Sequence, residues 1–128
     1  MLTPHSFEFA VIRVVPRVER GEFTNAGLIL FCLTKKTLLC RLHVDEARLQ
    51  ALWPQLDQEE LARHLAVFPA ICQGLENAGP ISRLTQRERF HWLTAPRSTV
   101  IQISPVHSGL CHDPETALNE LLQSLVVL

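Results

Sequence analysis

The sequence predicts an α+β fold, in which a small, mainly antiparallel sheet of about four strands packs against helices. Three apolar, strand-like segments follow one another between residues 7 and 44, joined by short or medium connections. From residue 45 onward the apolar residues recur at helical spacing, behind residues that are good helix N-caps. A run of strands followed by a run of helices is typical of this fold class.

The first two predicted strands, residues 7–15 and 26–33, are largely apolar on both faces. In the first, the alternating set that begins at Phe7 and the set that begins at Ala10 are both rich in apolar residues. We therefore expect both strands to lie inside the sheet. The third strand, residues 37–44, is apolar on one face only, so we expect it to be half exposed.

Helical spacing begins behind Asp45, which is expected to cap a short helix over residues 46–53. Asp57 with Glu60 forms a capping-box-like start to a longer helix. Pro69 should kink or split that helix, because proline lacks the backbone N–H. We expect residues 77–80 to end it. Its apolar stripe comprises Leu61, Leu65, Phe68, Cys72 and Leu75.

Thr85 and Glu88 form a second capping-box pair, ahead of a short helical segment. Residues 97–104 alternate and are rich in β-branched residues, which predicts a fourth strand, and residues 105–113 read as a loop. Asp113 then caps a final helix with proline at its first position. Its buried face is expected to comprise Leu118, Leu121, Leu122 and Leu125.

The composition fits one globular domain over residues 1–128, with 47% apolar and 20% charged residues. Twelve Lys and Arg residues against thirteen Asp and Glu leave the chain near neutral, which argues against a dedicated nucleic-acid binder. No apolar run is long enough for a membrane span, and the first residues do not resemble a signal peptide, so we expect a cytoplasmic protein. The four cysteines have no CxxC spacing, so we expect buried thiols.

The connection between the first two strands, residues 16–25, is longer than the about two to five residues of an ordinary hairpin. Arg13 precedes it on an apolar strand face, and a buried charge without a partner is costly. We therefore expect Arg13 to pair with Glu22 or to bind nearby backbone carbonyls. The connection is either a solvated loop with surface ion pairs, which contribute little, or a structured loop that presents Arg20, Glu22 and Asn25 to a ligand or partner.

In a second segment, residues 87–100, three arginines bracket His91 and Trp92, namely Arg87, Arg89 and Arg97. Arginines beside an aromatic residue and a histidine are one arrangement that can bind phosphate or stack on a base. The alternative is a short amphipathic segment with Phe90 and Trp92 in the core and the arginines outside.

His107, Cys111 and His112 lie close together near the C-terminal end. Zinc needs about four ligands, usually as two spaced pairs, and the second pair is missing, so we predict no structural zinc. Cys111 with a histidine base would make a nucleophile, but no local motif supports it. Motifs of hydrolases, P-loop proteins, dinucleotide-binding proteins and HExxH metalloproteases are absent, and no cofactor is predicted.

Two long segments carry an unusual pattern: AVIRVVPRVERGEFTNAGLIL, from residue 10, and RFHWLTAPRSTVIQISPVHSGLCHDPETALNELL, from residue 89. Over nearly its whole length the chain resembles a bacterial family called domain of unknown function 3037. The matching positions are Arg13, Pro16, Arg20, Gly21, Glu22, Asn25 and Gly27, then Arg89, Phe90, Trp92, Pro96, Arg97, Ser98, Pro105 and His107.

The resemblance implies no reaction, cofactor or catalytic residue. Genes of the family are often described beside genes for HipA-type serine/threonine kinases, which implies a small accessory or antitoxin-like role by analogy.

Two functional hypotheses follow. The first is a non-enzymatic interaction or accessory module, with a HipA-like kinase as candidate partner. The second is a small enzyme or ligand-binding domain for a phosphorylated or nucleotide-like anion, which requires arginines to converge in one pocket. The candidate binding residues are Arg13, Arg20, Glu22, Asn25, Arg89, Arg97 and His107.

Overall fold

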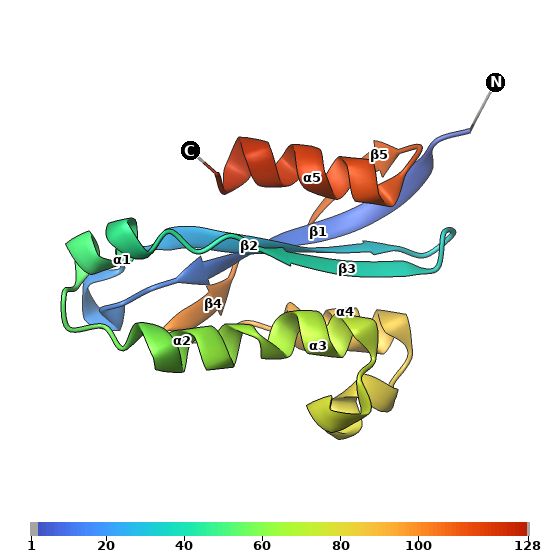
Figure 1. Ribbon diagram of the computed structural model, residues 1–128. Helices are drawn as coiled ribbons and strands as arrows, with labels where there is room; N and C mark the ends of the chain where they lie inside the picture. The colour runs from blue at the N-terminus through green and yellow to red at the C-terminus, as the bar shows by residue number, and fades with distance from the viewer. Residues whose placement is uncertain (1–2, 128) are drawn as a thin grey trace.

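The computed structural model describes residues 3–127, and its elements form three layers (Figure 1). A five-stranded antiparallel sheet is the middle layer, with helix α5 over one face and helices α2, α3 and α4 over the other. The predicted α+β class is confirmed. The helices are α1 (Glu46–Leu52), α2 (Gln58–Leu65), α3 (Val67–Gln73), α4 (Gln86–Leu93) and α5 (Pro114–Leu125).

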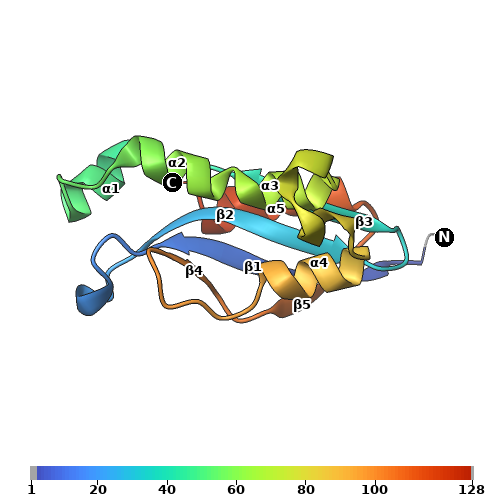
Figure 2. The same cartoon turned by 90° about the horizontal axis from the view of Figure 1, so that it is seen from below.

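Strand β1 (His5–Val14) pairs along both of its edges. On one side it pairs with β2 (Thr24–Cys32), which pairs in turn with β3 (Thr37–Leu42), so the predicted antiparallel meander is present. On the other side, β4 (Ile101–Ile103) and β5 (His107–Cys111) share the same edge of β1, one after the other. Figure 2 shows β4 and β5 following one another along this edge.

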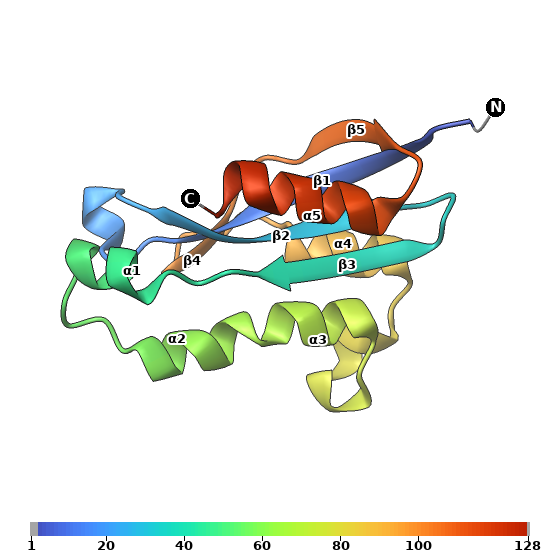
Figure 3. The same cartoon turned by 45° about the horizontal axis from the view of Figure 1, so that its top comes forward.

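Strands β1 and β2 are buried on both faces, as their sequences predict. On one face, Ile12 and Phe31 belong to the core that the strands form with α2, α3 and α4. On the other face, Phe9 and Leu30 pack against α5, whose Leu118 is fully buried. Figure 3 shows α5 lying along this second face. Two separate cores therefore fix β1 from above and below.

All four predicted N-caps form. The side chains of Asp45, Asp57, Thr85 and Asp113 each accept the backbone N–H three residues further on. Glu88 completes a capping box by accepting the backbone N–H of Thr85 at 3.1 Å. This hydrogen bond holds the pKa of Glu88 below its usual value. The helix starts were therefore predictable from local sequence.

The predicted break at Pro69 is confirmed, because α2 and α3 are separate helices and the proline lies in the first turn of α3. The predicted helix end at residues 77–80 was wrong. Helix α3 ends four residues earlier, where Gly74 adopts the left-handed conformation at φ 70°, as glycine does at many helix ends. Leu75 is consequently 43% exposed and does not belong to the buried stripe.

The predicted fourth strand, residues 97–104, is shorter than expected, since only three of its residues are in β4. The predicted loop, residues 105–113, was wrong because it contains β5. Sequence missed this strand because its apolar surface comes from β1, where Phe7 packs over Gly109. Leu125, predicted to be buried, is 40% exposed because α5 ends there.

All four cysteines are buried and unbridged, as predicted. A hydrogen bond with the Cys72 thiol, together with burial, raises the pKa of Cys40, so its thiol stays protonated. Within residues 3–127, no helix is both long and apolar enough to cross a membrane.

Gly109→Ala should destabilise the protein by about 1–3 kcal/mol, because the new Cβ would overpack a buried ring. That Cβ would stand 2.7 Å from Cζ of Phe7. Urea unfolding of Gly109→Ala, Phe7→Leu and the double variant measures the coupling. We expect the double variant to lose less stability than the sum of the two single changes. Strict additivity would contradict this close packing of β5 on β1.

Candidate functional site

Arg13 lies near the end of the β1 face that α5 covers. Residues that alternate along a strand share a face, so Arg13 follows Phe9 and Val11 on this side of the sheet. The last turn of α5 reaches the same place, because Leu125 and Arg13 line one cavity. The helix therefore covers the apolar part of the face and ends beside the arginine.

A β-bulge in β2 places Asn25 opposite Arg13. The register runs from Ile12 opposite Gly27 directly to Arg13 opposite Asn25, so Ala26 is an extra residue on β2. Bulges of this kind redirect side chains and are common beside functional sites. The side-chain Nδ2 of Asn25 donates a hydrogen bond to the backbone oxygen of Leu125 at 2.9 Å, which ties β2 to the end of α5.

The other neighbour of β1 is also irregular at this level. Between β4 and β5 the chain bulges at Pro105, which has no backbone N–H to donate. Ser104 keeps both backbone polar groups of Val11 paired at this point. Its N–H donates to the Val11 oxygen at 2.9 Å, and its Oγ accepts the Val11 N–H at 2.8 Å. His107 resumes the pairing opposite Phe9, with the two rings 5.5 Å apart.

These two irregularities border a cavity of about 370 Å³. Its walls come from β1, β2, the β4–β5 connection and α5, and they include three of the residues predicted from sequence, Arg13, Asn25 and His107. Sequence reasoning missed Ser104 and Ser108, which also line it. The only available signal was Pro105, because a proline inside a β-rich stretch indicates an edge or a bulge.

Two residues that line the cavity, Arg13 and Asn25, each carry a buried polar atom without a hydrogen-bond partner among the described residues. Cζ of Arg13 lies over the Phe23 ring, 4.5 Å from its centre, in a cation–π contact. Arg13 Nε and Asn25 Oδ1 are both buried and have no hydrogen-bond partner among the described residues. Buried polar groups are nearly always paired, so two unpaired atoms on directly opposite residues require an explanation.

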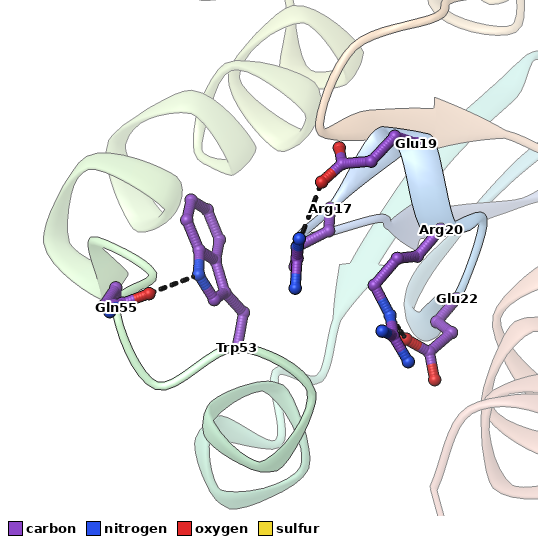
Figure 4. A network of polar contacts seen from close by, with 6 residues as sticks. All are labelled: Arg17, Glu19, Arg20, Glu22, Trp53 and Gln55. Carbon is purple, nitrogen blue, oxygen red and sulfur yellow. Dashed lines mark hydrogen bonds and ion pairs between the residues drawn. The ribbon is translucent and has the colours of Figure 1, made fainter.

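The predicted pairing of Arg13 with Glu22, or with backbone carbonyls, was wrong. Glu22 accepts a 2.5 Å hydrogen bond from Arg20 Nε, and both side chains are exposed in the β1–β2 connection (Figure 4). This hydrogen bond lowers the pKa of Glu22. Arg20 ends the short 3-10 turn Val18–Arg20, and Glu22 follows it two positions later. The two side chains therefore pair locally, and Glu22 is not available to Arg13.

Arg89 has a structural position. Its Nη1 donates to the backbone oxygens of Ile71 and Cys72, at 2.7 and 3.0 Å, and its Nε donates to the oxygen of Leu84 at 3.0 Å. Carbonyls in the last turn of a helix lack partners inside the helix. Arg89 therefore closes the end of α3 and joins it to α4.

Arg97 does the same for α4. Its Nη1 donates to the Leu93 oxygen at 2.6 Å, and its Nη2 donates to the Trp92 oxygen at 3.2 Å. The guanidinium also lies over the rings of Trp92 and Phe68, at 5.2 and 5.3 Å. Burial lowers the pKa of Arg97. Arg20, Arg89 and Arg97 are thus held in three places by three sets of partners, and they do not form the common pocket that the anion hypothesis required.

In residues 3–127, no group of three His, Cys, Asp or Glu side chains is arranged to hold a metal ion. His107 and Cys111 lie at opposite ends of β5.

A family model described as "Protein of unknown function (DUF3037)" matches residues 9–126. The chain therefore belongs to this family, and the resemblance noted in the sequence is confirmed. Comparisons with curated proteins and with solved structures found no match.

Arg89→Met should lower the free energy of unfolding by about 1–3 kcal/mol, because it leaves buried carbonyls without a charged donor. Arg20→Met is the matched control and should leave the urea midpoint nearly unchanged, since its ion pair is exposed. Equal midpoints for the two variants would contradict the structural role of Arg89.

Proposed function

We propose that this member of the DUF3037 family is a non-enzymatic binding module that holds a small anion in the cavity at Arg13. The ligand carries an anionic oxygen and, beside it, an O–H or N–H donor. One observation carries the proposal: two residues that face each other across β1 and β2 carry a buried donor, Arg13 Nε, and a buried acceptor, Asn25 Oδ1, that have no partner among residues 3–127.

The positive charge of Arg13 supports an anionic ligand. No carboxylate among residues 3–127 forms an ion pair with it. The Arg13 guanidinium lies over the Phe23 ring in a cation–π contact, and a guanidinium makes planar contacts to phosphate or carboxylate through its N–H groups. A guanidinium held in this way is preorganised for an oxyanion.

Asn25 supports the second part of the ligand description. Its Nδ2 is committed to Leu125, so the amide orientation is fixed and Oδ1 can only accept a hydrogen bond. A fully deprotonated anion would place lone pairs against this oxygen. An anion that keeps a proton would satisfy Asn25 and Arg13 together.

The size of the cavity agrees with a small ligand, because about 370 Å³ lies at the lower end of the usual range for such sites. The HipA-type kinase partner implied by the family resemblance remains a prediction. The cavity would serve such a partner only if that partner displayed the same anionic group.

Inorganic phosphate and sulfate test the proposal directly. Both are oxyanions of similar shape, but at neutral pH phosphate keeps an O–H and sulfate has none. By calorimetry at constant ionic strength, phosphate should bind about tenfold more tightly than sulfate, because it alone can donate to Asn25. Equal affinities, or no binding of phosphate, would contradict the proposal.

Arg13→Met keeps the apolar stem and removes the charge, and it should abolish phosphate binding. Arg20→Met is the control for the loss of one positive charge and should bind phosphate normally. A competing role for Arg13 is to balance the carbonyls at the end of α5. In that case Arg13→Met would lower the melting temperature, and phosphate would have no effect on either protein.

A further inference from the structure

A second cavity, of about 410 Å³, lies away from Arg13, between the α1–α2 connection, α2 and the segment that enters β4. Trp53, Leu56 and Leu61 contribute apolar surface from the helical side, and Ile101 contributes it from β4. Trp53 is only partly buried, and its indole N–H donates to Gln55 at 2.6 Å, which fixes the ring at the edge of the groove (Figure 4).

The charges along this groove are acidic. Among the described residues that line it, Asp57 and Glu60 are carboxylates, His64 is the one basic side chain, and there is no lysine or arginine. Asp57 caps α2, whose N-terminus offsets only about half a charge. Figure 4 shows the nearby β1–β2 connection, where Arg17 and Arg20 are already occupied by carboxylates of their own loop. The groove therefore has an apolar floor and a negative rim.

Strand β4 adds a free edge to the groove. It ends the sheet, and the residues on either side of it bond to β1 through the oxygen of Val100 and the N–H of Ser104, in phase with Gln102, which pairs with Arg13. Alternate residues of a strand direct their backbone groups to opposite sides, so those of Ile101 and Ile103 point away from β1. Thr99 Oγ1 donates to the Ile101 oxygen, and the described residues give no partner to the N–H groups of Ile101 and Ile103.

We propose that this groove binds an extended segment of a partner protein, which adds along the free edge of β4. One apolar side chain of the segment enters the groove between Trp53 and Ile101. Basic side chains two residues before and after it share its face and meet Asp57 and Glu60, because side chains alternate in a strand with a period of two. Strand addition supplies the backbone hydrogen bonds, and the groove and its charges supply specificity.

The probe is a panel of acetylated and amidated pentapeptides, Lys-Thr-X-Thr-Lys, with Leu, Ile, Val or Phe at X. Trp92→Phe leaves Trp53 as the single tryptophan, so its fluorescence reports the groove. At least one peptide should bind, and the same peptide with Glu in place of Lys should not.

Asp57→Asn with Glu60→Gln removes both charges and keeps the helix cap, since asparagine caps as well as aspartate. This double variant should bind the lysine peptide several-fold more weakly. Arg48→Gln is a control that changes a charge on α1 and does not line the groove.

Backbone N-methylation tests the strand geometry. Methylation at X alone and at the two Thr residues alone blocks opposite edges of the peptide, so one pattern should abolish binding and the other should not. Binding that survives both patterns would overturn strand addition. Failure of all four lysine peptides to bind would overturn the proposal. A Trp53 fluorescence signal that changes with protein concentration alone would also overturn it, because it would show that a second copy of the protein occupies the groove.

Discussion

Strand β1 is enclosed on four sides, and the arrangement of the molecule depends on this enclosure. It has strand neighbours on both edges and helical layers over both faces. A strand in this position must be apolar almost throughout, because an unpaired charge inside it is costly. Arg13 can belong to β1 only because the cover ends there, at the last turn of α5 and at irregularities in both neighbouring strands.

The two irregularities have different physical causes but the same result. In β2 an extra residue, Ala26, shifts the register so that Asn25 faces Arg13. Beside β4, Pro105 interrupts the ladder, and the Ser104 hydroxyl takes the place of a backbone acceptor for Val11. A buried N–H left without an acceptor would cost about 1–3 kcal/mol. Because the Ser104 hydroxyl accepts the Val11 N–H, the ladder is interrupted at Pro105 without this loss of stability. The cavity at Arg13 is thus a direct consequence of how β1 is enclosed.

Much of the fold could be predicted because it depends on local patterns. The double-sided apolar runs identified β1 and β2, and Asp45, Asp57, Thr85 and Asp113 marked the helix starts. The elements that were missed depend on distant residues. Strand β5 has little apolar pattern of its own and is stabilised by pairing with β1.

Only part of the candidate site was selected from the sequence, and the arrangement of its residues was not. Arg13, Asn25 and His107 were each selected and do share a cavity. Glu22 was assigned to the wrong arginine, because a pattern of charges does not show that Arg20 reaches it first. In the sequence, Arg89 and Arg97 resembled ligand-binding arginines. Their actual role, donating to carbonyls at the ends of α3 and α4, could not be predicted because it depends on where those helices end in space.

The Nε–H signal of Arg13 in nuclear magnetic resonance spectra reports directly on the buried donor that has no partner among residues 3–127. We expect this signal to exchange slowly with solvent, to shift when phosphate is added and to be unchanged by Glu22→Gln. The signal of Arg20 should behave in the opposite way, with a response to Glu22→Gln and none to phosphate. An Arg13 signal that moves with Glu22→Gln and is indifferent to phosphate would contradict the account.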